Sequence, residues 1–207
     1  THLQDATPIR LGQEFSGYAQ MVKNAISRLK NAQLLLSELA QGGTAVGTGI
    51  NTHKEFGKRI AEEISLFSGV KFKEAENHFE AQASQDAAVE LSGALKTIAV
   101  SLSKIANDIR WLGSGPRAGL GELILPAVQP GSSIMPGKVN PVICEAMIQT
   151  CAQVIGNDLA ITLGGQGGFF ELNLMLPLIA HNLLQSIQIL SNASIMFTEK
   201  LVNGLIA

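Results

Sequence analysis

The sequence predicts an all-α protein in which long helices pack lengthwise into a bundle. Apolar residues recur in alternating steps of three and four through most of the 207 residues, which is the spacing of a helix seam. Gly- and Pro-rich breaks separate these periodic segments. No alternating polar and apolar run is long enough to predict a useful strand pair, and long helices joined by Gly-rich loops form a bundle.

The first long helix is predicted to begin near Leu11 and to end before Gly42-Gly43. Pro8 near its start and the two glycines after it are typical of helix boundaries. Its apolar seam comprises Leu11, Phe15, Tyr18, Val22, Ala25, Leu29, Ala32, Leu36 and Leu39. A shorter helix is predicted from Phe56 to Ser68.

The second seam predicts a long helix that Gly113-Ser114-Gly115-Pro116 ends. Its members are Leu91, Leu95, Ile98, Leu102, Ile105, Ile109 and Leu112. A third helix is predicted from about Pro141 to Leu163. Its inward positions are expected to be Cys144, Ile148, Cys151, Ile155 and Leu159.

A fourth long helix is predicted from about Leu172 to Val202, after the break at residues 164–168. It is apolar on most sides, which marks a buried helix. One of its faces is overfilled with apolar residues, namely Leu174, Met175, Leu178 and Ile179. A single bundle would leave part of this surface exposed, so we expect contacts with other subunits.

The amino-acid composition of the chain argues for some classes of function and against others. The chain is 46% hydrophobic and 15% charged, below the roughly 25% charged residues of an average globular protein, which favours surface buried against partner subunits. The net charge of −2 argues against nucleic acid as a partner. No run of about 18 apolar residues predicts a membrane span. Cys144 and Cys151 are interpreted as core thiols, because their spacing forms no disulfide or zinc framework.

The segment Gly131–Asn140, with the sequence GSSIMPGKVN, is the most informative part of the chain. A Ser can act as a nucleophile or base, Lys and Asn can hold a carboxylate, and Gly and Pro shape a loop. A phosphate-binding P-loop is excluded by the spacing of the two glycines, by the Val139 that follows Lys138, and by the lack of a preceding strand. From these residues alone, a Gly-rich connector without function remains an open alternative.

Several motifs resemble those of the fumarase/aspartase superfamily. Gly131–Asn140 resembles its signature loop, and the segments Thr1–Pro8 and Gly42–Asn51 resemble two other shared stretches. Three further segments are specifically similar to class II fumarase: Leu112–Glu122, Cys144–Ala146 and Phe170–Asn173. The resemblance extends over essentially the whole chain. It implies that residues 1–207 are the central helical-bundle domain of a longer chain, that the N- and C-terminal domains are absent, and that the bundle forms part of a multi-subunit helical core in a homotetramer.

The resemblance also implies a role for each candidate residue of the site. Ser132 would be the base that removes a proton from the carbon beside a carboxylate, and His2 would pair with Glu145. The expected substrate contacts are Thr1, Ser133, Lys138, Val139 and Asn140. From the residues alone, an exposed terminal histidine is the favoured interpretation of His2, and Glu145 could also complement a helix dipole.

The implied activity is the reversible anti hydration of fumarate to (S)-malate, through a carbanion spread into the neighbouring carboxylate. It requires no metal or organic cofactor. Because the resembling enzymes build each site from three subunits, we expect residues 1–207 alone to be poorly active. Alternatives are an aspartate ammonia-lyase, which Pro141-Val142-Ile143 resembles, and a non-catalytic helical oligomer like the lens crystallins. The expected location is cytoplasmic, or mitochondrial in a eukaryote.

Overall fold

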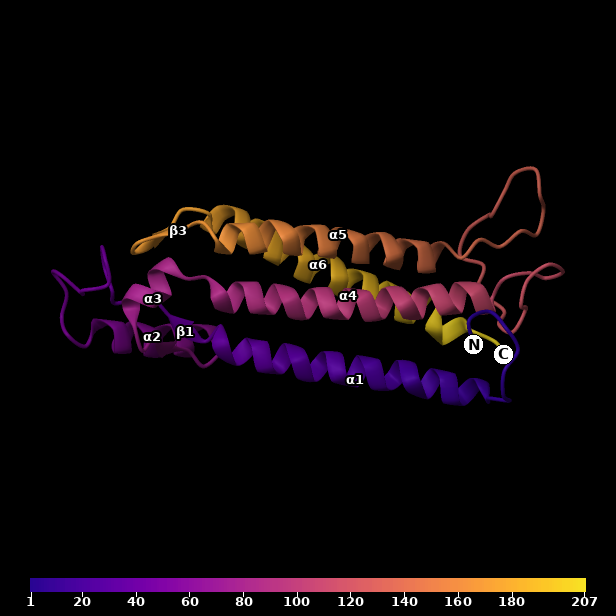
Figure 1. The fold of residues 1–207 in the computed structure, drawn as a ribbon, viewed down its shortest axis with the longest axis horizontal. Helices are drawn as coiled ribbons and strands as arrows, with labels where there is room; N and C mark the ends of the chain where they lie inside the picture. The colour runs from indigo at the N-terminus through magenta and orange to yellow at the C-terminus, as the bar shows by residue number, and fades with distance from the viewer.

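The computed structural model describes all 207 residues as an elongated bundle of four long helices (Figure 1). These helices are α1 (Leu11–Leu35), α4 (Asp86–Leu112), α5 (Val142–Gly165) and α6 (Leu176–Lys200). The shorter helices are α2 (Phe56–Ser68), α3 (His78–Ala83) and the 3-10 turn η1 (Val202–Gly204). The predicted all-α fold class is confirmed.

Four very short strands accompany the helices. The strand β1 (Glu38–Leu39) pairs in parallel with β2 (Lys73–Glu74), and β3 (Gly168–Phe169) pairs antiparallel with β4 (Leu172–Asn173). Each strand has two residues, and a strand this short leaves no alternating pattern in the sequence. Because two of these strands occupy residues that the sequence assigned to helices, two helix boundaries differ from the prediction. The helix α1 ends at Leu35 because residues 38–39 pair with β2, and α6 begins at Leu176 because residues 172–173 form β4.

The helix α4 lies at the centre of the bundle, in contact with α1, α5 and α6. Its predicted seam is confirmed: Leu91, Leu95, Ile98, Ile105 and Ile109 are each at most 8% exposed. Burial of a side chain of this size contributes about 1.5–3 kcal/mol. This central helix therefore carries much of the apolar core.

The inward face predicted for α5 is right in its first half and wrong in its second. Cys144 and Cys151 are at most 1% exposed, but Ile155 and Leu159 are 41% and 62% exposed. The residues buried in the second half are Val154, Asn157, Asp158, Ile161 and Gly164. Asn157 and Asp158 are polar, so a prediction based on apolar residues alone assigns the wrong face of the helix to the core.

The buried polar residues of α5 have partners on both neighbouring helices. Asp158 accepts hydrogen bonds from the Ser92 hydroxyl at 2.7 Å and the Lys96 ammonium at 2.6 Å, both on α4. The Asn157 amide donates to the Ser186 hydroxyl on α6 at 3.0 Å. These bonds satisfy groups that would otherwise be costly to bury, and they fix the register of α4, α5 and α6.

The prediction that α6 is buried on most sides does not hold within a single chain. Leu184 is 66% exposed and Ile195 is 54% exposed, because α5 and α4 cover only part of its surface. None of the helices is both long and apolar enough to cross a membrane.

The two ends of the bundle differ in what they carry (Figure 1). The short helices α2 and α3 and all four strands gather at one end, whereas η1 lies at the other, beside the C-terminus. Both chain termini and the loops between α4 and α5 lie at the other end. Thr1, His2 and the segment 131–140 therefore share one end of the molecule.

Candidate functional site

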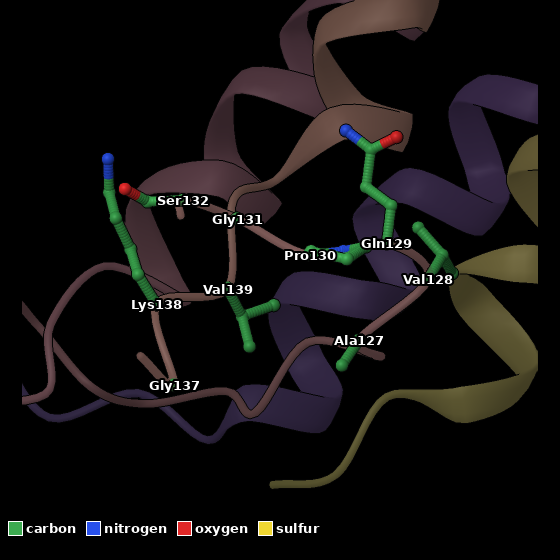
Figure 2. Close-up of a pocket in the computed structure, with 9 residues that line it drawn as sticks. All are labelled: Ala127, Val128, Gln129, Pro130, Gly131, Ser132, Gly137, Lys138 and Val139. Atoms are coloured by element: carbon green, nitrogen blue, oxygen red, sulfur yellow. The ribbon is translucent and has the colours of Figure 1, made fainter. Parts of the chain in front are cut away.

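The segment Gly131–Asn140 forms a loop immediately before α5, and we call it the serine loop. It borders an open pocket of about 500 Å³. Figure 2 shows the residues that line this pocket: Ala127, Val128, Gln129, Pro130, Gly131, Ser132, Gly137, Lys138 and Val139. Four of them, residues 127–130, precede the loop and were not among the predicted site residues.

The two ends of the serine loop meet at a tight neck. A Cβ added to Gly131 would lie 1.8 Å from the carbonyl oxygen of Lys138, so no other residue fits there without moving the backbone. The Asn140 side-chain amide donates a hydrogen bond to the carbonyl oxygen of Gly131 at 3.0 Å. At the tip, Gly137 has a φ of +79°, in the left-handed region that glycine tolerates.

Ser132 and Lys138 bring a hydroxyl and an ammonium group to the same pocket. The two side chains point to the same side of the serine loop in Figure 2. The Ser132 hydroxyl oxygen accepts a hydrogen bond from the Ile134 backbone N–H at 3.3 Å. The Lys138 ammonium makes no ion pair within the chain. A donor on the hydroxyl oxygen and a nearby positive charge both favour the deprotonated form of a serine.

The remaining predicted residues of the loop differ in position. Val139 lines the pocket, whereas Ser133 is exposed and lies outside its lining. Asn140 is partly buried, and its amide is engaged with Gly131. An amide nitrogen carries two protons, so one of them remains for a ligand.

Glu145 lies in the first turn of α5, directly after the serine loop. Its backbone N–H bonds the Pro141 carbonyl at 3.0 Å. Burial raises the pKa of the neighbouring Cys144 thiol to about 11; the Arg110 guanidinium on α4 opposes this shift and Glu145 adds to it. The charges of the Glu145 carboxylate and the Arg110 guanidinium thus both act on the first turn of α5. Arg110 was missed by the sequence analysis, since only the packing of α4 on α5 brings it there.

Thr1 and His2 are exposed at the same end of the bundle. The amino group of Thr1 donates to the Gln4 carbonyl at 2.8 Å. No hydrogen bond or ion pair joins His2 to Glu145 within the chain. The structure therefore brings Ser132, Lys138, Val139 and Asn140 together on one loop and leaves the predicted His2–Glu145 pair unformed within one copy.

The glycine-rich segment 42–49 lies at the opposite end of the bundle from the serine loop (Figure 1). Gly42 has a φ of +115°, and a Cβ there would lie 2.6 Å from the Cα of Gly57. The close approach of the two backbones explains why a glycine occupies position 42. The ring nitrogen Nε2 of the partly buried His78 lies 3.1 Å from the Gln41 carbonyl oxygen, a contact that ties α3 to the start of this segment.

Two further features of the chain bear on ligands and partners. No three His, Cys, Asp or Glu side chains gather closely enough to hold a metal ion. An apolar groove of about 400 Å³ runs between α1, α4 and α6. Its lining includes Phe15, Met21, Ile26, Leu102, Phe197 and Val202.

Known proteins match this chain over nearly its whole length. The fumarate hydratase, mitochondrial, of Dictyostelium discoideum is 59% identical over 205 residues, which cover 99% of this chain and 42% of that protein. The fumarate hydratase class II of Neisseria meningitidis is 57% identical over 99% of this chain and 44% of its own length. The chain thus spans about two fifths of the length of these curated relatives.

Solved structures match equally well. A class II fumarase from Schistosoma mansoni superposes with a TM-score of 0.97 at 41% identity, covering 100% of this chain and 46% of that one. A fumarate lyase:delta crystallin from Brucella melitensis bound to cobalt has a TM-score of 0.96 at 50% identity, with coverages of 100% and 45%. The model of the lyase family, described as "Lyase", matches residues 1–156. The chain therefore belongs to this lyase family and has the fold of the class II fumarases.

Proposed function

We propose that the full protein is a fumarate hydratase, which adds water reversibly to fumarate to form malate. The observation that carries the proposal is the pocket that both Ser132 and Lys138 line, on a loop whose two ends meet at the neck. Identity of 57–59% to fumarate hydratases over 99% of the chain supports it.

In the malate-to-fumarate direction, the Ser132 oxygen removes a proton from the carbon next to a substrate carboxylate. A serine hydroxyl is a poor base, so the reaction needs help that stabilises its deprotonated form. The Ile134 N–H on the hydroxyl oxygen and the positive charge of Lys138 provide this help. Lys138 and the second amide proton of Asn140 then bind the carboxylate into which the developing negative charge spreads.

Loss of the hydroxyl from the neighbouring carbon requires an acid on the opposite face of the substrate. We assign this step to His2, directly or through a water molecule, with Glu145 stabilising the charged imidazole. Because the two side chains are unpaired within one copy, the proposal requires His2 of one subunit to meet Glu145 of another. Thr1 and Ser133 would contact the same substrate.

Such a shared site needs an oligomer, and we propose a homotetramer. The apolar groove between α1, α4 and α6 supports this assembly, as do the exposed Leu184, Ile187 and Ile195 of α6. Exposed apolar surface of this extent is typical of a subunit interface. We further propose that the protein acts in the cytoplasm of a bacterium or in the mitochondrion of a eukaryote; the Dictyostelium discoideum relative is named as mitochondrial, which supports the second location.

The test is an assay on the full-length protein that follows the ultraviolet absorbance of fumarate with malate or aspartate as the substrate. We expect fumarate to form from malate only. Formation from aspartate alone would identify an ammonia-lyase, and inactivity of the intact oligomer towards both would favour a crystallin-like role. Ser132→Ala should lower kcat by about 10²–10⁴-fold, as for the loss of a catalytic base, while circular dichroism shows unchanged helix content. A Ser132→Ala rate near that of the wild type would remove Ser132 from the mechanism.

A further inference from the structure

We infer that Asn140 is a positioning residue: its side chain latches the neck of the serine loop and thereby holds Ser132 and Lys138 in the pocket before any substrate binds. This inference rests on the proposed hydratase function, and it adds a second role to the carboxylate contact of Asn140. The latch is the hydrogen bond from the Asn140 amide to the Gly131 carbonyl at 3.0 Å. It is the only hydrogen bond that the Asn140 side chain makes in the structure.

The position of this bond explains what it controls. Gly131 directly precedes Ser132, and Asn140 follows Lys138 by two residues. Between these points, few bonds hold the loop: the Ile134 N–H bonds the Ser132 hydroxyl at 3.3 Å, and the Lys138 N–H bonds the Met135 carbonyl at 3.2 Å. Both bonds join residues only two or three positions apart, and both have long donor–acceptor distances. Asn140 is therefore the side chain that ties the two ends of the loop together.

Contact with the bundle cannot replace the latch. The residues from Ser133 to Val139 are exposed, as are residues 127–130 on the upstream side. Without the latch, the neck would be restrained mainly by the close approach of Gly131 to the Lys138 carbonyl. A contact of this kind keeps the chains from moving closer but does not keep them from moving apart.

The chain provides a matched latch elsewhere. The Asn173 amide donates to the Gly164 carbonyl at 3.1 Å, again nine residues back along the chain and again onto a glycine. This second latch closes the turn between α5 and α6, at the opposite end of the bundle (Figure 1). Asn173 is 1% exposed, whereas Asn140 is only partly buried and directly follows Val139, which lines the pocket. Asn173→Ala therefore serves as a control that breaks the same kind of bond far from Ser132.

The test measures amide hydrogen exchange by mass spectrometry in the substrate-free full-length protein, for wild type, Asn140→Ala, Asn140→Asp and Asn173→Ala. Exchange of the two hydrogen-bonded amides of residues 131–140, those of Ile134 and Lys138, should accelerate at least about fivefold in both Asn140 variants, since each variant loses the amide donor of the latch. It should stay unchanged in Asn173→Ala, whose faster exchange is confined to residues 164–175. Unchanged exchange of residues 131–140 in both Asn140 variants would overturn the inference.

Steady-state kinetics provides the second readout. With a loosened loop, Asn140→Ala should lower kcat by about 10²-fold, because a displacement of about 1 Å at the reacting groups costs that factor. Lys138→Met removes the positive charge near Ser132 and a carboxylate contact without touching the neck, so it should lower kcat and raise KM while exchange of the loop stays at the wild-type rate. If Asn140→Ala raises KM alone, Asn140 only binds the carboxylate and the latch is refuted. If the wild type lacks hydratase activity, the proposed function fails, and the exchange measurement still decides whether the latch exists.

Discussion

Gly131→Ala is the most direct test of the link between the geometry of the serine loop and catalysis. The new Cβ would lie 1.8 Å from the Lys138 carbonyl oxygen, whereas Cβ contacts under 3.0 Å essentially do not occur. The backbone on the two sides of the neck must therefore separate by about 1.2 Å. Such a shift also stretches the 3.0 Å bond from Asn140 to the Gly131 carbonyl beyond hydrogen-bonding length.

The magnitude follows from where the displaced atoms lie. Ser132 is the next residue along the chain, and a misplacement of about 1 Å at a catalytic group costs about 10²-fold in rate. The serine loop lies outside the core, so the bundle itself should remain intact. We therefore expect kcat to fall about 10²-fold while the free energy of unfolding falls by about 1.5–4.5 kcal/mol, the combined cost of one overpacked site and one lost hydrogen bond.

The assay compares kcat and urea unfolding of the full-length wild type, Gly131→Ala and Gly137→Ala. Gly137 has a φ of +79°, but no atom lies within 4 Å of an added Cβ. Gly137→Ala therefore introduces only left-handed backbone strain of about 1–2 kcal/mol without a clash at the neck. We expect its kcat to exceed that of Gly131→Ala by at least about tenfold. Equal rates for the two variants, or a wild-type rate for Gly131→Ala, would refute the reasoning.

Two further predictions concern the bundle. Lys96→Met should lower the free energy of unfolding by about 1–3 kcal/mol, because the buried Asp158 carboxylate loses its cation. Lys30→Met, on the exposed face of α1, is the control. Equal urea midpoints for the two variants would contradict the prediction. Burial raises the pKa values of the Cys144 and Cys151 thiols from 9.0 to about 11, and it is the neutral thiol that is favoured in the fold. The contribution of the neutral, buried thiols to the free energy of unfolding is therefore fully present below pH 9 and is lost as the pH rises from 9 to 11. Thiol alkylation at pH 8 should be slow in the native protein and fast in urea, and rapid native labelling would show that the thiols are accessible.

The sequence predicts the apolar part of this fold better than its polar part. The seam of α4 runs through aliphatic residues from Leu91 to Leu112, so periodicity alone identifies its buried face. On α5 the same method fails beyond Cys151, because Asn157 and Asp158 occupy buried positions that only their partners on α4 and α6 make tolerable. Those partners lie 62–66 residues upstream and 29 residues downstream. No local pattern contains that information.

The candidate site shows the same division. The residue types of the serine loop and its resemblance to a known signature predict that Ser132 and Lys138 act together, and the pocket contains both. The neck was not predicted, since the clash at Gly131 and the bond from Asn140 depend on how the loop folds back on itself. The His2–Glu145 pair stays a prediction, because it involves groups that one copy of the chain does not join.

The anchoring of the serine loop is unequal on its two sides, and this asymmetry determines how the loop can move. Downstream of Asn140, the chain enters α5 at once, and Cys144 and Met147 are fixed in the core with at most 1% exposure. Upstream, residues 127–130 are exposed, and the nearest buried residue is Leu123. Closure over a substrate would therefore be accommodated on the upstream side. Since Asn140 joins the upstream Gly131 to the start of α5, we expect it to limit the movement of Ser132 relative to Glu145, so that the two proposed site residues would keep their spacing during such a closure.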